Sequence, residues 1–374
     1  MARIIDFGSL AVAYATRLLA ESGHDVIRID LSGGDALRRM GPFLGDNPHL
    51  EHGAYHQFLN AGKRSLSLNV ESPAGRRIFT ELLQKSDALV ASRPLPLAEE
   101  ELRNIRPQLV FTKVEEEEAE LCAYARSGLL SLTGQPDGQP TVLGSHMIYL
   151  ATGIYVAVGT SAALYVLNQT GQGQTVCVSM KDCLETFIEQ AMVEYAFSGT
   201  KTERRGSRGT ITAISGALPC KDGHWVISQI NRPGRWEKFM DWVQDPELMA
   251  DPSLALDENQ NKKKDFIMDR IFVWARKFTK TDLVEEAQRR HFPASPVSSP
   301  LDLVEDPQLI ARGFLKEMNH PKFGRILFPQ GAIASVRGNS LSPAPTLGQH
   351  NREILAELGY SEPDHRTLTE IGAI

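Results

Sequence analysis

The sequence contains few cysteines and no excess of basic charge, which argues against a disulfide-bonded secreted protein and against a nucleic-acid-binding protein. Its cysteines form no CxxC pair and no spacing typical of a disulfide framework. We therefore expect a reducing compartment and a cytoplasmic protein. A formal net charge of -6 offers no basic surface for nucleic acid or an anionic membrane, so neither is expected as a partner. The cysteines are Cys122, Cys177, Cys183 and Cys220.

Several catalytic and binding motifs are also missing. The sequence contains no HExxH motif and no Cys/His cluster with the spacing of metal ligands, so no metal site is expected. No GxSxG elbow surrounds a serine, which argues against a hydrolase triad of that kind. Neither GxGxxG nor a Walker-type phosphate loop occurs, so a specific dinucleotide or nucleoside-triphosphate site is not predicted.

A long uncharged run is present at residues 148–167. It is long enough to span a bilayer. Gly153, Thr152 and Gly159 dilute its apolar character, and no cluster of Lys or Arg flanks it, so we predict a buried core helix. The N-terminus begins with a strand-like run at residues 3–7 and not with a basic segment followed by an apolar one, so no secretory signal is expected.

The first 180 residues alternate between strand and helix patterns. Strands are predicted over 3–7, 25–29, 65–68, 88–91, 109–112 and 175–179, and helices over 14–22, from 72 onward, over 119–133 and over 180–197. Strands that alternate with helices of ten or more residues predict an α/β domain with a mostly parallel sheet. A hairpin is predicted at 221–223, and further helices over 235–243, 264–276 and 351–358.

At 374 residues the chain is longer than a single core usually becomes, so two domains are expected. Residues 199–209 are rich in Lys, Arg, Gly and Ser and are interpreted as a connector. Residues 293–300, with prolines and serines, are interpreted as a second connector.

Two loops offer cations beside predicted strands. Gly33 and Gly34 precede Arg38 and Arg39 at the end of a strand, where open α/β sheets bind ligands. A glycine-rich turn of this kind can hold a phosphate, or it can be a tight turn with solvated arginines. Residues 60–64 add Lys63 and Arg64, which can equally bind an anion or face solvent.

Acidic and nucleophilic residues occur between residues 115 and 150. Glu115 to Glu118 are predicted to form a solvated run at a helix start, where the helix dipole favours negative charge. Glu120 stands among apolar residues and can act as an acid or base, or as a surface cap. Cys122 is predicted to be a buried apolar residue. His146 follows Ser145, but neighbouring side chains diverge, so the two do not form a catalytic dyad.

Taken in order, these segments resemble the class III CoA-transferases, the family of carnitine and formyl-CoA transferases. LNAGKRS at 59–65 resembles the family's LNxGKRS loop, and TGQGQ at 170–174 its TGxGQ turn. The remaining matches are 14–20, 25–30, 33–35 with Arg38, SG at 127–128, TG at 133–134, DG at 137–138, PASPV at 293–297, ARGF at 311–314 and LGQH at 347–350.

The resemblance implies a Rossmann-like large domain formed by both chain ends, with a smaller inserted α+β domain, in subunits that interlock as dimers. The large domain would comprise 1–200 and 321–374, and the inserted domain 201–320. No covalently bound cofactor is implied, and a coenzyme A thioester would be the substrate. Arg38, Lys63, Arg64 and Ser92 are the residues that would bind CoA.

This sequence departs from the family at the nucleophile. Family transferases attack the acyl-CoA thioester with an aspartate at the start of the helix before TGxGQ, and the matching position here is Tyr149. A neutral phenol cannot form the mixed anhydride. The related α-methylacyl-CoA racemases use a carboxylate there and a histidine where this chain has Ala119. The family's ENFRPG stretch is reduced to residues 91–96, and its glycine-rich strand end has become the acidic run 114–118.

Three hypotheses remain open. The chain is a divergent or catalytically silent subunit of a CoA-transferase, paired with a related subunit that keeps the aspartate. Alternatively, it is a homodimeric acyl-CoA enzyme with altered chemistry, using Glu120, Tyr149 or His146. In the third hypothesis it is a non-enzymatic acyl-CoA-binding protein. Aryl-succinate CoA-transferases are the precedent for a heteromer of two related subunits.

Overall fold

The computed structural model describes residues 1–116, 119–207, 213–214, 216–321, 323–332 and 341–374. They divide into two compact units. Unit 1 comprises Met1–Leu129, Val142–Lys201 and Gln308–Ile374, and unit 2 comprises Leu130–Thr141 and Thr202–Pro307. Unit 1 thus contains both chain ends. The second change of unit falls at 307/308 and not at 320/321, since the paired strands Leu315–His320 and Gly324–Pro329 both belong to unit 1.

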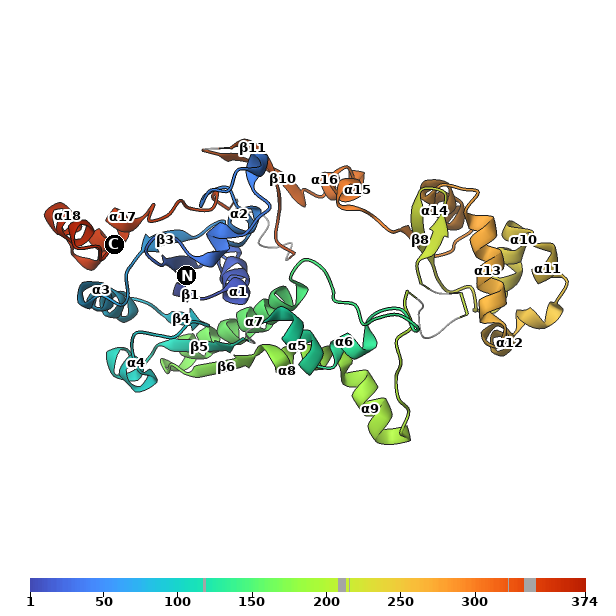
Figure 1. Ribbon diagram of the computed structural model, residues 1–374, viewed down its shortest axis with the longest axis horizontal. Helices are drawn as coiled ribbons and strands as arrows, with labels where there is room; N and C mark the ends of the chain where they lie inside the picture. The colour runs from blue at the N-terminus through green and yellow to red at the C-terminus, as the bar shows by residue number, and fades with distance from the viewer. Residues whose placement is uncertain (117–118, 208–212, 215, 322, 333–340) are drawn as a thin grey trace. The chain divides into compact units, whose positions relative to one another are not determined.

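Unit 1 is built on a six-stranded sheet in which every neighbouring pair is parallel (Figure 1). This confirms the predicted α/β class. The chain runs from β1 in the middle of the sheet outward through β2 to β3 at one edge. It then returns to the middle and places β4 on the other side of β1, so the direction of strand addition reverses between β1 and β4. Ligands bind open sheets of this order outside the carboxyl ends of the strands at that reversal. The order is β3 (Arg64–Ser67), β2 (Asp25–Asp30), β1 (Arg3–Phe7), β4 (Ala88–Ala91), β5 (Val110–Glu115), β6 (Thr175–Ser179).

Helices cover both faces of this sheet and bury alternate strand residues. On one face α1 (Leu10–Glu21) and α7 (Met147–Thr170) pack on Ile4 and Val90. On the other face α3 (Pro73–Gln84), α4 (Glu99–Ile105), α17 (Asn351–Leu358) and α18 (Glu362–Glu370) cover Ile5 and Ile27. Ile4 and Ile5 of β1 are both fully buried, one on each face of the sheet, as expected for a strand that helices cover on both sides.

The start of α3 follows from its sequence. The Ser72 hydroxyl accepts a hydrogen bond from the Gly75 backbone N–H at 3.0 Å, and Pro73 occupies the first helical position. Both features are typical of a helix N-terminus. The helix predicted from residue 72 onward is therefore confirmed, with Ser72 as its N-cap and Pro73 as its first residue.

Helix α7 is the one helix in the described part of the chain that is long and apolar enough to cross a membrane, by length and composition only. Its inner face packs on α1, where a Cβ at Gly153 would lie 2.8 Å from the Ala11 carbonyl oxygen, so the close approach requires glycine. Its outer face exposes Ile154, Val158 and Tyr165. The prediction of a buried core helix is therefore corrected: only one face is buried.

Shorter elements complete unit 1. The predicted helix 180–197 is divided into three pieces. β10 and β11 pair antiparallel. The elements are η1 (Ala36–Arg39), η2 (Leu44–Asp46), α2 (Ala54–Leu59), α5 (Glu120–Arg126), α8 (Met180–Glu185), η3 (Thr186–Ile188), α9 (Glu189–Ser198), β10 (Leu315–His320) and β11 (Gly324–Pro329), with α6 (Leu129–Leu132) and α16 (Pro307–Ala311) at the unit boundaries.

Unit 2 is an α+β unit with its own core, in which Trp225, Phe239 and Trp274 pack together. β7 (Leu218–Cys220) and β8 (Gly223–Ile227) form the predicted hairpin. The segment 293–300, predicted as a connector, contains β9 (Ala294–Pro296), which pairs antiparallel with β8. The helices are α10 (Arg235–Val243), α11 (Pro246–Met249), η4 (Pro252–Ala255), α12 (Asp257–Lys262), α13 (Lys264–Ala275), α14 (Lys280–Arg289) and α15 (Pro300–Val304).

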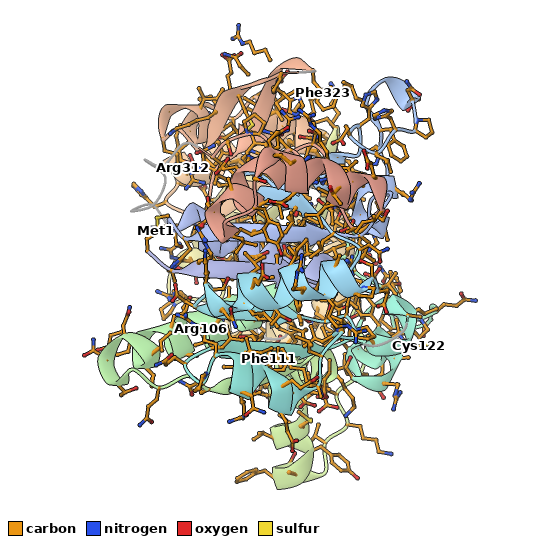
Figure 2. All side chains as sticks on the ribbon, turned by 90° about the vertical axis from the view of Figure 1, so that its left-hand side faces the viewer. Met1, Arg106, Phe111, Cys122, Arg312 and Phe323 are labelled. Carbon is orange, nitrogen blue, oxygen red and sulfur yellow. The ribbon has the colours of Figure 1, made fainter. Side chains whose placement is uncertain are left out.

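The two ends of the strands in unit 1 can be followed in Figure 2. Met1 and Arg106 mark the edge at which β1 and β5 begin, and Cys122, just after β5, marks the opposite edge, where the strands end. Cys122 is exposed there, so its predicted burial was wrong. The carboxyl edge is where the candidate site lies.

Candidate functional site

A network of buried charges holds the loops that follow β1 and β2. The Asp6 carboxylate accepts hydrogen bonds from Arg28 at 2.9 Å, Lys63 at 2.8 Å and Thr16 at 2.7 Å. Arg28 also pairs with Asp35, the residue that caps η1. Burial alone would raise the pKa of Asp6, but Arg28 and Lys63 outweigh it and the pKa lies below its usual value.

Arg38 continues this network through the same loops. Its guanidinium binds both oxygens of Asp30, at 3.0 and 2.8 Å, and donates to Glu51 at 2.9 Å. His56 lies 3.1 Å from it. Burial and the adjacent Arg38 lower the pKa of His56 to about 3, so the imidazole is neutral. We call Asp6, Arg28, Asp30, Asp35, Arg38, Glu51, His56 and Lys63 the arginine network.

The arginine network corrects the predicted roles of Arg38 and Lys63. Both side chains are buried, and the Lys63 ammonium donates to Asp6, to the Ala13 carbonyl and to Asn60, all within 2.9 Å. Burial lowers the pKa of Lys63 to about 8 despite the pairing with Asp6. These cations are used by the fold, because they hold the loops after β1 and β2, and neither is available to contact CoA.

Arg64 lies away from the carboxyl edge. It is the first residue of β3, and it pairs with Asp25, the first residue of β2, at 2.6 Å and with Glu353 and Glu357 of α17. The starts of parallel strands lie at the opposite edge from a ligand site. The predicted role of Arg64 in CoA binding is corrected accordingly: it fastens α17 to the sheet.

A series of hydrogen bonds connects the loops that follow β1, β4 and β5, beside the point where the strand order reverses. The Ser9 backbone N–H, at the start of α1, donates to the Ser92 hydroxyl at 3.0 Å, and the Ser9 hydroxyl donates to Glu116. Burial raises the pKa of Glu116, while its hydrogen bonds with Ser9 and Ser92 oppose that shift. The acidic run is therefore not wholly solvated as predicted, because Glu116 turns inward. Glu117 and Glu118 lie outside the described residues.

Ser92 also belongs to the wall of a cavity of about 300 Å³ at the ends of β4 and β5. Arg93 lies beside it, pairs with Asp35 at 3.3 Å, and keeps one buried guanidinium nitrogen without a hydrogen-bond partner among the described residues. The remaining lining residues are Ala91, Pro94, Leu95, Glu99, Phe111, Lys113 and Val114. The unsatisfied Arg93 nitrogen, together with Lys113, whose ammonium also pairs with Glu115 at 3.3 Å, makes this cavity suitable for an anionic or strongly polar group.

Glu120 and His146 form the most distinctive contact of this edge. The Glu120 carboxylate lies 2.8 Å from the His146 ring nitrogen Nδ1, although the two residues are 26 positions apart. Glu120 is the first residue of α5, and the Tyr124 hydroxyl one turn later donates to the Leu143 carbonyl at 3.2 Å, which ties α5 to the loop before α7. Sequence spacing alone did not predict this pair.

The backbone at His146 is unusual. Ser145 and His146 both have left-handed φ angles, 63° and 53°. Such angles cost free energy for residues other than glycine and are concentrated at functional sites. His146 occupies the N-cap position of α7, with no capping hydrogen bond from its side chain, and so precedes the first turn of that helix directly.

Tyr149 stands on that first turn, beside His146. Their rings lie 6.1 Å apart, and the Tyr55 ring from α2 meets His146 edge-on at 5.2 Å. Burial and then the nearby Glu116 and Glu120 raise the pKa of the Tyr149 phenol, so it is protonated at neutral pH. The structure thus brings the predicted residues Glu120 and Tyr149 together. We call Tyr55, Glu116, Glu120, His146 and Tyr149 the tyrosine cluster.

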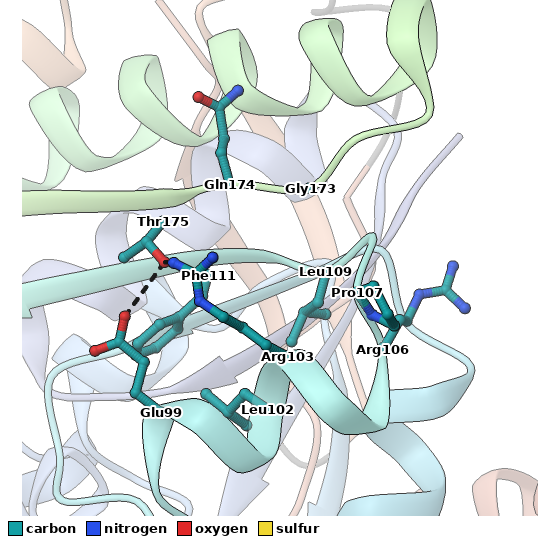
Figure 3. Close-up of a pocket in the computed structure, with 10 residues that line it drawn as sticks. All are labelled: Glu99, Leu102, Arg103, Arg106, Pro107, Leu109, Phe111, Gly173, Gln174 and Thr175. Atoms are coloured by element: carbon teal, nitrogen blue, oxygen red, sulfur yellow. Dashed lines mark hydrogen bonds between the residues drawn. The ribbon is translucent and has the colours of Figure 1, made fainter.

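A second pocket between α4 and the outer strands is a closed structural contact. There Arg103 donates to the Thr175 hydroxyl at 3.1 Å, and that hydroxyl donates to Glu99 at 3.3 Å (Figure 3). The space is about 20 Å³, enough for little more than one water molecule. It fastens α4 to the edge strand β6 and leaves no room for a substrate.

The chain belongs to CoA-transferase family III, whose model matches residues 2–351. It is 29% identical to succinyl-CoA:mesaconate CoA-transferase of Haloarcula marismortui, with 98% of each chain covered. It is 28% identical to formyl-CoA:oxalate CoA-transferase of Streptomyces coelicolor, over 96% of this chain and 95% of that protein. It is 30% identical to the succinyl-CoA:(R)-benzylsuccinate CoA-transferase subunit BbsE of Thauera aromatica, over 100% of this chain and 97% of that protein.

A solved structure has the same fold. The CaiB/BaiF family protein from Brucella suis matches with a TM-score of 0.85 at 23% identity, over 96% of this chain and 98% of that one. The predicted family and fold are therefore confirmed, and a coenzyme A thioester is the substrate type that the family implies.

Proposed function

We propose that this chain is the subunit of a CoA-transferase assembly that lacks the transfer nucleophile, and that a related subunit supplies the aspartate. The observation that carries the proposal is Tyr149, which stands on the first turn of α7, where the family resemblance puts the attacking carboxylate. A tyrosine phenol, with an ordinary pKa of about 10, is protonated at neutral pH, and burial and two nearby carboxylates raise the pKa of this one further. A neutral phenol cannot form the acyl anhydride on which CoA transfer depends.

The relative from Thauera aromatica supports a heteromer. Its name describes one subunit of a succinyl-CoA:(R)-benzylsuccinate CoA-transferase, and this chain covers 97% of its length. We therefore infer that this chain, like that one, works beside a different subunit. The reducing, cytoplasmic setting expected from the cysteines is part of the same proposal.

The cavity beside Ser92 is our proposed place for part of the CoA molecule. CoA carries phosphates, and Arg93 and Lys113 are the cations that line this cavity. Arg93 holds an unpaired buried nitrogen that an anionic or polar ligand group would satisfy. Of the four CoA-binding residues predicted from the sequence, Ser92 alone stays in the proposal.

Exposed apolar side chains on neighbouring parts of unit 1 support a partner subunit. On α7 they are Ile154, Val158 and Tyr165, and on α9 Val193, Tyr195 and Phe197. Apolar surface of this extent is uncommon on a chain that works alone. A related subunit packed on these helices would remove it from water, in line with the interlocked pairing that the family resemblance implies.

The proposal is tested by co-expression with a related chain that has aspartate at the position of Tyr149. Native mass spectrometry should find a mixed oligomer, and Tyr165→Arg should weaken it. Asn168→Arg on the same helix is the matched control, since residue 168 is exposed and polar. A chain that forms only homo-oligomers and transfers CoA by itself would overturn the proposal.

Transfer by the mixed oligomer gives a second test. Replacing the partner's aspartate with alanine should abolish transfer, whereas Tyr149→Phe in this chain should leave the rate within about threefold, because the phenol forms no covalent intermediate. A loss of transfer in Tyr149→Phe comparable with that of the partner's variant would show that this chain holds an essential group.

A further inference from the structure

The pair Glu120 and His146 has the geometry of a general base held by a carboxylate. With Nδ1 2.8 Å from the Glu120 carboxylate, a neutral imidazole places its proton on Nδ1 and leaves the lone pair of Nε2 free. Among the described residues no hydrogen bond to Nε2 is present. About a third of the His146 side chain is exposed (32%), so water reaches it.

Two further features indicate that this pair is more than a surface ion contact. His146 has a left-handed φ of 53°, which costs backbone free energy in a residue that carries a side chain. The Tyr55 and Tyr149 rings lie 5.2 and 6.1 Å from the imidazole. A solvated ion pair needs neither a left-handed backbone nor two aromatic neighbours.

We propose that this chain itself hydrolyses acyl-CoA thioesters, with His146 as general base, Glu120 as its positioning residue and Tyr149 as the donor to the carbonyl oxygen. This hydrolysis depends on the proposed CoA-transferase role in one respect, because acyl-CoA must bind at this edge of unit 1. It adds an activity, with water as the acceptor, that requires no aspartate.

The chemical step balances without any other reactant. His146 Nε2 takes a proton from water while the water oxygen bonds to the thioester carbonyl carbon. The protonated Tyr149 phenol donates a hydrogen bond to the oxyanion that forms. When the carbon–sulfur bond breaks, the CoA thiolate takes the proton from the imidazolium, and the products are a carboxylic acid and free CoA.

The charges of the tyrosine cluster define the acyl class. The Glu120 carboxylate lies 2.8 Å from the His146 ring, and Glu116 is fixed at the same edge of the sheet by the Ser9 hydroxyl. A second carboxylate on the acyl group would therefore be repelled. Uncharged acyl groups are the expected substrates, and succinyl-CoA should be hydrolysed more slowly than butyryl-CoA.

The experiment measures thiol release from butyryl-CoA and succinyl-CoA by the purified full chain, with CoA binding followed by calorimetry. His146→Gly should lower kcat by about a hundredfold or more, and added imidazole should restore part of the rate. Glycine accepts the left-handed backbone of residue 146 without strain. Ser145→Gly makes the same backbone change one residue away, keeps the imidazole, and should leave kcat unchanged.

The variant Glu120→Gln distinguishes a role of Glu120 in orienting His146 from a role in the stability of the fold. It should lower kcat while leaving KM and CoA binding unchanged, and Glu120→Asp should recover part of the rate. CoA binding without any hydrolysis would overturn this inference and leave the proposed subunit function intact. Hydrolysis that persists in His146→Gly would overturn the assignment of the base. A chain that binds no CoA would remove the proposed acyl-CoA role as well.

Discussion

The arginine network and the tyrosine cluster lie along the same edge of one sheet, and they differ in how their charges are matched. In the network three cations, joined by Arg93 at Asp35, face four carboxylates, and Asp6, Arg28, Asp30 and Arg38 are shielded from water almost completely. In the cluster two carboxylates, a histidine and two phenols share a partly exposed space. Matched, buried charges fix the loops, whereas partly exposed groups remain available to a ligand.

The largest expected effect concerns the network. Arg38→Met should lower the free energy of unfolding by about 3–5 kcal/mol, because Asp30 and Glu51 would remain buried without their partner. Urea denaturation measures this change. Arg39→Ala on the same short helix is the control, because Arg39 is exposed, and its effect should stay within about 0.5 kcal/mol. Similar values for both variants would remove the distinction between a buried network and a solvated arginine.

A smaller effect is expected from acidification. The unfolded chain binds a proton at His56 near pH 6.5, but the folded chain does so only near pH 3, so stability is lost as the pH falls through this window. Between pH 7.5 and pH 5 this loss amounts to about 2 kcal/mol, at about 1.36 kcal/mol per pH unit below 6.5. Urea denaturation at the two pH values should show it, and His56→Gln should flatten the slope. An unchanged slope in this variant would contradict a neutral buried imidazole.

The smallest effect concerns the tyrosine cluster and has the opposite sign. Because burial raises the pKa of Glu116, the folded chain holds a proton that the unfolded chain has already lost, and stability falls as the pH rises above 4.5 through this window. Glu116→Gln should therefore be more stable than the natural chain at pH 7, by less than about 1 kcal/mol, since the group is only partly buried.

This small gain should disappear near pH 4, where both states of the natural chain are protonated, and paired denaturation curves at pH 4 and pH 7 test it. Glu115→Gln is the matched control, because Glu115 is exposed and precedes Glu116 directly. If Glu116→Gln were less stable than the natural chain at pH 7, the ionised carboxylate would be stabilising, as the paired carboxylates of the arginine network are, and the raised pKa of Glu116 would be contradicted.

Much of unit 1 could be predicted from the sequence. Residues 3–7, 88–91 and 175–179 are strands with the predicted bounds, and every residue of 88–91 is buried because helices cover both faces of the parallel sheet there. Ser72 with Pro73 marked the start of α3 for an equally local reason, and Gly359 the end of α17. The family motifs, also local, identified CoA-transferase family III.

The functional roles of the cations could not be predicted in this way. Arg38, Lys63 and Arg64 look alike in sequence, since each is a cation beside a strand. Their ion-pair partners are Asp30, Asp6 and Asp25, which lie on β2 and β1 and are brought within reach by the order of the strands in the sheet. An arginine motif therefore indicates an ion pair, but only the register of the sheet decides whether its partner is a ligand or the protein itself.

The sequence by itself determined the strands, the capped helices and the family, because each depends on residues close together in the chain. Only the tertiary structure decided which charges are matched. It buried Arg38 and Lys63, turned Glu116 onto Ser9, and brought Glu120 to His146. The physical reason is that these contacts join residues 26 to 107 positions apart, or lie across strands whose order reverses, and local sequence patterns do not specify such distances.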